Sequence, residues 1–140
     1  MPTFRLDPKL RKDTHLLGLF EGLHLLLMNN RLVPWFILVP ETSATELYEM
    51  TPELQKAVLK AVGLLSPFVK RAFDAQKLNV ASIGNLVSQM HIHVVGRSPE
   101  DFCWPAPVWG AQGGKPYGEK EVEKIKKAVE KEFPTAFTPS

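Results

Sequence analysis

The stretch Gln-Met-His-Ile-His-Val-Val, residues 89–95, has the alternating pattern of a half-buried strand. Successive side chains of a strand point to opposite faces of a sheet. In an extended conformation, Gln89, His91 and His93 line one face at a spacing of about 7 Å. The apolar side chains between them line the other face and would anchor the strand in the core. The stretch therefore predicts a strand that displays three polar groups at a site.

Composition is that of an ordinary globular protein, and we expect a single domain over residues 1–140. Hydrophobic residues make up 44% and charged residues 23% of the chain. A net charge of +2 gives no reason to expect a nucleic-acid or membrane partner. Residues 1–14 lack the apolar core of a signal peptide, and Cys103 is the single cysteine. A reduced, cytoplasmic protein is the expectation.

The first part of the chain predicts three short strands. Residues 1–13 are polar, with a turn at Asp7-Pro8. Three apolar runs follow, at residues 15–20, 23–28 and 35–39. Turn-forming residues separate the runs, so they predict an antiparallel meander.

Two helices complete the pattern. Thr51 and Pro52 suit a helix start, and apolar residues recur from there at three- and four-residue spacing to about residues 73–76. A last helix is expected over about residues 118–133. A fourth strand at residues 78–83 would form a hairpin with the 89–95 strand. The prediction is an α+β fold: a five-stranded antiparallel sheet, one long helix between the third and fourth strands, and a C-terminal helix.

The two histidines by themselves allow three interpretations. They could be surface residues of a strand. They could bind zinc, but a third protein ligand is needed, and no spacing ties His15, His24 or Cys103 to them. The third interpretation is nucleophilic catalysis at phosphorus, since a neutral imidazole is a good nucleophile near pH 7. No metal site is predicted.

The surroundings of the pair resemble the signature of the histidine triad (HIT) family. The fragment at residues 79–95 is similar to the family's His-φ-His-φ-His-φ-φ motif and its preceding loop, where φ is apolar. The strand at residues 34–40, the helix before the signature and Trp104-Pro105 after it also resemble the nucleotide-binding branch of that family. The resemblance covers about residues 15–109. It departs from the family at the first histidine, which is Gln89 here.

The resemblance implies catalytic roles for three residues. His91 matches the nucleophile that attacks the α-phosphorus of a nucleoside phosphate and forms a nucleotidyl-histidine. A backbone carbonyl would hold its other nitrogen, and His93 is the expected supplier, through its ring or its carbonyl. His93 would also lie near the phosphate. Gln89 can donate and accept hydrogen bonds as a neutral imidazole does, but it cannot titrate near pH 7.

The resemblance also implies a set of nucleotide-binding residues. Leu86 stands where the family often has Ser or Thr, so one hydroxyl donor is missing. Trp35 stands where the family often has His, so a second imidazole near the phosphate is missing and the site has fewer titrating groups. Arg97 is interpreted as a solvated surface charge, and Trp104 and Trp109 as packing or dimer contacts. The residues expected to contact the nucleotide are Asn85, Asn79, and either Asn29 or Asn30.

The expected substrate is an adenine nucleotide such as a diadenosine polyphosphate or an adenosine phosphoramidate. No cofactor is required by this chemistry, although magnesium can accompany a polyphosphate. The resemblance further implies a homodimer in which two sheets join. The alternative is a nucleotide-binding sensor or interaction protein that uses the same pocket without turnover.

Overall fold

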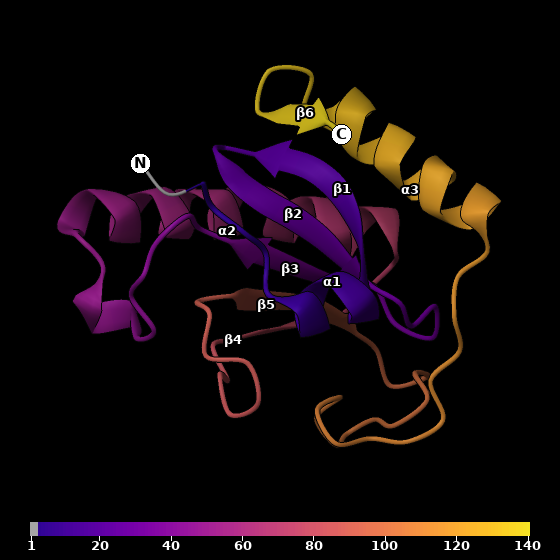
Figure 1. The fold of residues 1–140 in the computed structure, drawn as a ribbon. Helices are drawn as coiled ribbons and strands as arrows, with labels where there is room; N and C mark the ends of the chain where they lie inside the picture. Colours follow the sequence, from indigo (N-terminus) through magenta and orange to yellow (C-terminus); the bar gives the residue numbers. More distant parts are fainter. Residues whose placement is uncertain (1–2) are drawn as a thin grey trace.

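A computed structural model describes residues 3–140 as one antiparallel sheet with helices around it (Figure 1). The strand order in the sheet is β4-β5-β3-β2-β1-β6. The α+β fold class, the long helix after β3 and the C-terminal helix are confirmed. In chain order the elements are α1 (Pro8–Asp13), β1 (Thr14–Phe20), β2 (Leu23–Met28), β3 (Trp35–Val39), the 3-10 turn η1 (Leu47–Glu49), α2 (Pro52–Ala72), β4 (Lys77–Ala81), β5 (Ile92–Arg97), α3 (Glu119–Glu132) and β6 (Phe137–Pro139).

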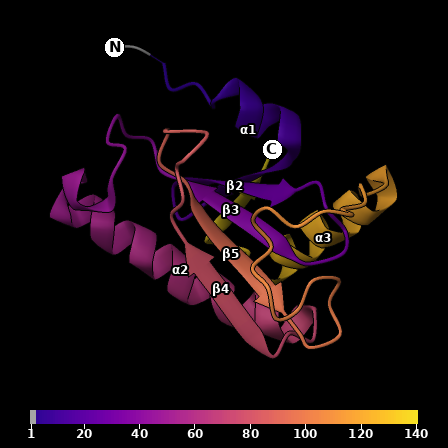
Figure 2. The same cartoon turned by 90° about the horizontal axis from the view of Figure 1, so that it is seen from below.

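The sheet separates two apolar clusters. Phe36 and Leu38 of β3 and Val94 of β5 point to one face, where α2 and α3 pack. Trp35 and Val95 point to the other face, which α1 and the loop after β5 cover. Both faces of the central strands are thus buried, and all five residues of β3 are inaccessible to solvent or nearly so. Figure 2 shows α1 and α2 on opposite sides of the sheet.

The long helix begins as the sequence predicts. The Thr51 side chain accepts a hydrogen bond from the Leu54 amide at 3.2 Å, and Pro52 occupies the first turn. Pro67 lies inside the helix without ending it. Among residues 3–140, no helix is long and apolar enough to cross a membrane.

Two elements were not predicted. The Asp7-Pro8 pair starts helix α1 rather than a turn: Asp7 Oδ1 accepts a hydrogen bond from the Lys9 amide at 2.8 Å, and Pro8 is the first helical residue. The C-terminal residues form β6, which pairs with β1 and makes the sheet six-stranded instead of five-stranded.

Strand β5 begins at Ile92, so the predicted strand over residues 89–95 starts three residues too early. The reason lies in the partner strand. The pairing of β3 with β5 ends at Leu38 opposite Ile92, and Pro40, just beyond, has no amide hydrogen for a ladder. Gln89 and His91 therefore lie in the segment that leads into the strand.

Candidate active site

Three aromatic side chains form the bottom of a pocket on the α1 side of the sheet, and we call Trp35, His93 and Trp109 the aromatic floor. Trp35 of β3 and His93 of β5 are diagonal neighbours, since Trp35 pairs with Val95. The ring of Trp109 stands edge-on at 5.3 Å from the ring of His93 and 6.0 Å from that of Trp35. His93 is only 5% exposed.

A hydrogen bond fixes the proton of His93. The indole Nε1 of Trp35 lies 2.9 Å from His93 Nδ1. An indole nitrogen can only donate, so Nδ1 accepts and the neutral ring carries its hydrogen on Nε2. Burial, with a smaller contribution from His91, lowers the pKa of His93 from 6.5 to about 4. His93 is therefore neutral at pH 7.

His91 has the opposite tautomer. Its Nδ1 lies 2.7 Å from the backbone carbonyl oxygen of Gln89. A carbonyl oxygen only accepts, so Nδ1 carries the hydrogen and Nε2 keeps its lone pair. A backbone carbonyl was expected here, but the prediction that His93 supplies it is wrong. The centres of the two imidazole rings lie 4.9 Å apart. The lone pair on His91 Nε2 and the N–H donor on His93 Nε2 therefore belong to adjacent rings.

The side chain of Gln89 does not stand in line with His91 and His93. Its Oε1 accepts a hydrogen bond from the Asp7 amide, and its Nε2 donates to the Arg5 carbonyl, both at 2.8 Å. The predicted row of three polar groups on one strand face is thus corrected, because Gln89 precedes the strand and alternation does not govern its direction.

The pocket above the floor has a volume of about 440 Å³. Three segments line it besides the floor and His91. Helix α1 contributes Lys9, Leu10 and Asp13; β2 contributes Met28; and the loop after β4 contributes residues 83–87, including Asn85. Asn85 thus lies at the pocket, as expected of a nucleotide-binding residue. Leu86 is 87% exposed at its rim.

The other predicted asparagines have different partners. Asn79 accepts from Arg97 Nη1 at 2.9 Å. Asn29 Oδ1 accepts from the Tyr117 amide at 2.9 Å, and Asn30 Oδ1 accepts from the amides of Leu32 and Lys115 at 3.1 and 3.3 Å. None of the three lines the pocket beside His91. The Asn79 bond joins β4 to β5, and the bonds of Asn29 and Asn30 tie the segment before α3 to the loop after β2.

Arg97 is buried, and its interpretation as a solvated charge is wrong. It is 2% exposed and bonds Asp101 through two nitrogens at 2.7 and 3.2 Å. It also donates to the Ala106 carbonyl at 2.7 Å. These bonds fix the loop that places Trp109 on the aromatic floor. The signal in the sequence was Asp101, four residues after Arg97 and just before the proline-rich loop.

The remaining histidines lie elsewhere. His15 Nε2 is 3.0 Å from Asn29 Oδ1, and His24 Nε2 is 2.9 Å from Glu41 Oε1. Within residues 3–140, no group of three or more His, Cys, Asp or Glu side chains could hold a metal ion.

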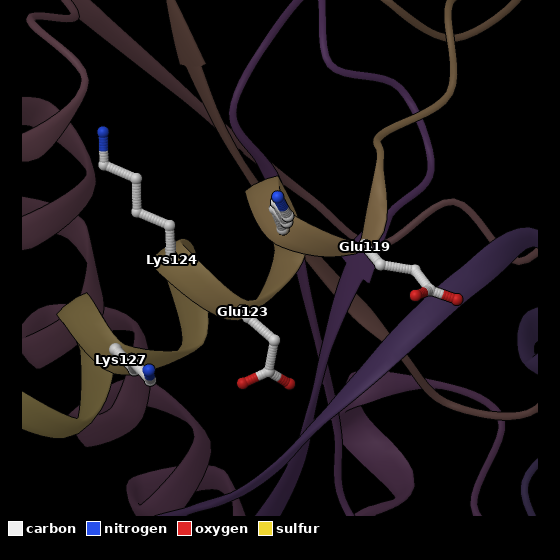
Figure 3. A pocket seen from close by; sticks show the side chains of 5 residues that line it. Glu119, Glu123, Lys124 and Lys127 are labelled. Atoms are coloured by element: carbon white, nitrogen blue, oxygen red, sulfur yellow. The ribbon is translucent and has the colours of Figure 1, made fainter.

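A second hollow lies along α3 and offers no comparable chemistry. Figure 3 shows Glu119, Glu123 and Lys124 extending from the helix in different directions. All of its lining residues belong to that one helix: Glu119, Lys120, Glu123, Lys124 and Lys127. Unlike the pocket at His91, it is formed by one element alone and includes no buried histidine.

A long helix on one face of the sheet and a pair of imidazoles with fixed, opposite tautomers on the other define a histidine-based site of the HIT type. The chain belongs to the histidine triad family, since the model of the HIT domain matches residues 9–100.

Solved structures of histidine triad proteins are similar over nearly the whole chain. The protein from Marinobacter aquaeolei VT8 is 38% identical with a TM-score of 0.90, covering 96% of this chain and 99% of that one. The protein from Sinorhizobium meliloti 1021 is 35% identical with a TM-score of 0.89, covering 93% and 97%. The protein from Bradyrhizobium japonicum is 29% identical with a TM-score of 0.88, covering 94% and 98%. A comparison with curated proteins finds no match.

Proposed function

We propose that the chain is a nucleotidyl hydrolase or transferase that acts at the α-phosphate of an adenine nucleotide. The observation that carries this proposal is the 2.7 Å contact between His91 Nδ1 and the Gln89 carbonyl oxygen. It directs the lone pair of His91 to Nε2, on a residue that lines the pocket. Membership of the histidine triad family supports the same chemistry.

The reaction has two steps. His91 Nε2 attacks the α-phosphorus, the bond between that phosphorus and the leaving group breaks, and the leaving group takes the electron pair. Water then attacks the same phosphorus, the electron pair of the phosphorus–nitrogen bond returns to Nε2, and the water proton passes to solvent. The Gln89 carbonyl stabilises the positive ring of the intermediate through Nδ1–H. The Nε2–H of His93 is the donor available to a phosphoryl oxygen.

In this proposal Gln89 acts through its backbone carbonyl, which holds His91 Nδ1. The side-chain amide of Asn85 is the group at the pocket that would bind the nucleotide. No protein metal ligand enters either step. Magnesium bound to the polyphosphate would neutralise charge on the substrate.

A direct assay tests the proposal. The protein is incubated with diadenosine tetraphosphate or adenosine 5′-phosphoramidate, and release of AMP is measured. We expect turnover that falls at least about a thousandfold in His91→Ala, the scale seen when an enzyme loses its nucleophile. Equal AMP release by the parent and His91→Ala would contradict the proposal.

One observation favours a different function. The Gln89 side chain is committed to the N-terminal segment and gives the pocket no group. A protein that binds nucleotides without cleaving them would use the same pocket. It would bind AMP by calorimetry in both the parent and His91→Ala but release none from either substrate.

We also propose that a second copy of the chain covers the edge of the sheet at β4. Val80 is 47% exposed on this edge strand, next to an apolar groove of about 540 Å³ that includes Tyr48 and Leu59. Antiparallel joining of two β4 edges would pair the free backbone groups. Sedimentation should show a dimer that Leu59→Lys weakens; a monomer at all concentrations would contradict this.

A further inference from the structure

The N-terminal residues form one side of the candidate active site, and we call residues 5–13 the N-terminal wall. Leu10 of this wall is 5% exposed and packs in the apolar cluster on the site side of the sheet. Lys9, Leu10 and Asp13 line the same pocket as His91. Figure 2 shows that α1 covers this side of the sheet, away from α2.

Gln89 holds the wall by a pair of hydrogen bonds that we call the Gln89 clamp. The two bonds join residues 82 and 84 positions apart in the sequence. One edge of a carboxamide presents an N–H and a carbonyl oxygen side by side. An extended backbone likewise presents the carbonyl of one residue and the amide of the next residue but one, here Arg5 and Asp7. The two nitrogens of an imidazole diverge from the ring, so histidine matches this pair poorly.

The clamp and Leu10 bring a cation to the pocket. Lys9 Nζ lies 2.9 Å from Asp13 Oδ2 at the pocket rim, and its side chain is 54% exposed. An ammonium with rotatable donors is suited to bind a phosphate group. A phosphate bound there would replace the Asp13 carboxylate as the anionic partner of Lys9.

The groups around His91 restrict the leaving group. An amine leaving group must gain a proton, whereas a phosphate leaves as a stable anion. His93 is neutral at pH 7, and its Nδ1 is occupied by the Trp35 indole. Gln89 does not titrate near that pH. Neither group beside His91 is thus an imidazolium that could protonate an amine, whereas Lys9 offers a positive charge to an anionic leaving group.

We propose that the N-terminal wall selects substrates whose leaving group is a phosphate, because Lys9 binds that phosphate and the Gln89 clamp holds Lys9 in place. This inference rests on the proposed function and adds the class of substrate. In the step it concerns, the bond from the α-phosphorus to the bridging oxygen breaks, the oxygen keeps the electron pair, and Lys9 faces the resulting charge. No proton transfer is needed.

The first experiment compares two leaving groups. The ratio of kcat/KM for diadenosine tetraphosphate to kcat/KM for adenosine 5′-phosphoramidate is measured at low salt. We expect Lys9→Ala to lower this ratio about fivefold, as for one partly exposed ion pair, and the effect to shrink with added salt. Lys12→Ala removes the same charge from the same helix at an exposed residue outside the pocket. It should leave the ratio unchanged.

The second experiment tests the clamp. Gln89→Met keeps the length of the side chain and removes both hydrogen bonds. We expect faster hydrogen exchange of the backbone amides in residues 5–13. We also expect the ratio of the two kcat/KM values to fall about as far as it does in Lys9→Ala. Adding Lys9→Ala to Gln89→Met should then have little further effect, since both changes remove the same contact. Independent, multiplying effects would overturn the role of the clamp.

A binding measurement separates this inference from the proposed function. In His91→Ala protein, Lys9→Ala should weaken the binding of diadenosine tetraphosphate about fivefold and leave the binding of AMP unchanged, because AMP has no second phosphate to meet Lys9. This result can hold even if the parent shows no turnover, in which case the proposed function alone fails. Equal effects of Lys9→Ala and Lys12→Ala would overturn the selection by Lys9.

Discussion

The floor and the N-terminal wall of the pocket are built in different ways. The aromatic floor is held by the central strands β3 and β5 and by the buried Arg97. The wall is held by Leu10 and the partly buried Leu6, by a hydrogen bond from the Asn29 amide to the Asp13 carbonyl, and by the two hydrogen bonds of the Gln89 clamp. The proton position on His93 is therefore fixed by residues of the central strands, which are part of the core. The wall has fewer buried residues than the floor, and in the proposal above it is the part that selects the leaving group, through Lys9.

The largest expected effect is at Arg97, which anchors the loop that carries Trp109. Arg97→Met would leave the Asp101 carboxylate buried without its partner, since that side chain is 6% exposed. We expect the free energy of unfolding to fall by about 3 kcal/mol or more in urea denaturation. Arg71→Met breaks the exposed ion pair with Glu132 and should cost less than about 1 kcal/mol. Similar losses in the two variants would contradict the anchoring role of Arg97.

The next effect is a dependence of stability on pH. The pKa of His93 is about 4 in the folded protein, whereas its ordinary value, taken for the unfolded chain, is 6.5. The unfolded chain therefore binds a proton first as the pH falls. The contribution of His93 to the free energy of unfolding is fully present above pH 6.5. As the pH falls from 6.5 to 4, the free energy of unfolding decreases by about 2 to 3 kcal/mol.

Urea denaturation between those pH values measures this loss. His93→Gln retains an acceptor for Trp35 but does not titrate. We expect the free energy of unfolding of this variant to fall less steeply as the pH is lowered. An unchanged slope would show that His93 is not the titrating group.

A smaller effect is expected for Trp35→Phe. It removes the donor to His93 Nδ1, which lies 2.9 Å from the indole nitrogen. A buried acceptor without a partner costs about 1 to 2 kcal/mol. The hydrogen of His93 can then move to Nδ1, so kcat should fall even where the protein is folded. Trp104→Phe, at a residue 39% exposed, is the matched control, and an equal loss of activity there would exclude a specific role for Trp35.

The smallest effect is expected at the rim. Leu86 is 87% exposed, so Leu86→Ser should change the free energy of unfolding by less than about 0.5 kcal/mol. The added hydroxyl can donate to a phosphate in the pocket, and kcat/KM for diadenosine tetraphosphate should rise severalfold. A large loss of stability would contradict the independence of the rim from the core.

The sequence was sufficient for the central elements because their periodicity is long and regular. The apolar spacing of α2 and the Thr51-Pro52 start predicted that helix, and the three apolar runs predicted the meander. Helix α1 was missed because six residues with one buried leucine give no period, and the Asp7-Pro8 pair suits a turn as well as a helix start. The short strand β6 pairs with a strand more than a hundred residues away.

Much of the site depends on contacts that one sequence does not contain. The roles proposed for His91 and His93 came from a local motif and the family it resembles. The bond from Trp35 to His93 depends on the register of two strands 58 residues apart. The direction of Gln89 depends on where β5 begins, which Pro40 of a different segment limits. The resemblance to the family likewise could not show that Gln89 holds Arg5 and Asp7.

Trapping the covalent intermediate tests the role of His91 most directly. The protein is mixed with diadenosine tetraphosphate and quenched with alkaline denaturant, because phosphorus–nitrogen bonds of histidine hydrolyse in acid. Mass spectrometry of the peptides should find one adenylyl group on His91 and none on His93, and no adduct in His91→Ala. An adduct on another residue, or AMP release at full rate with no adduct at any time, would contradict a nucleophilic His91.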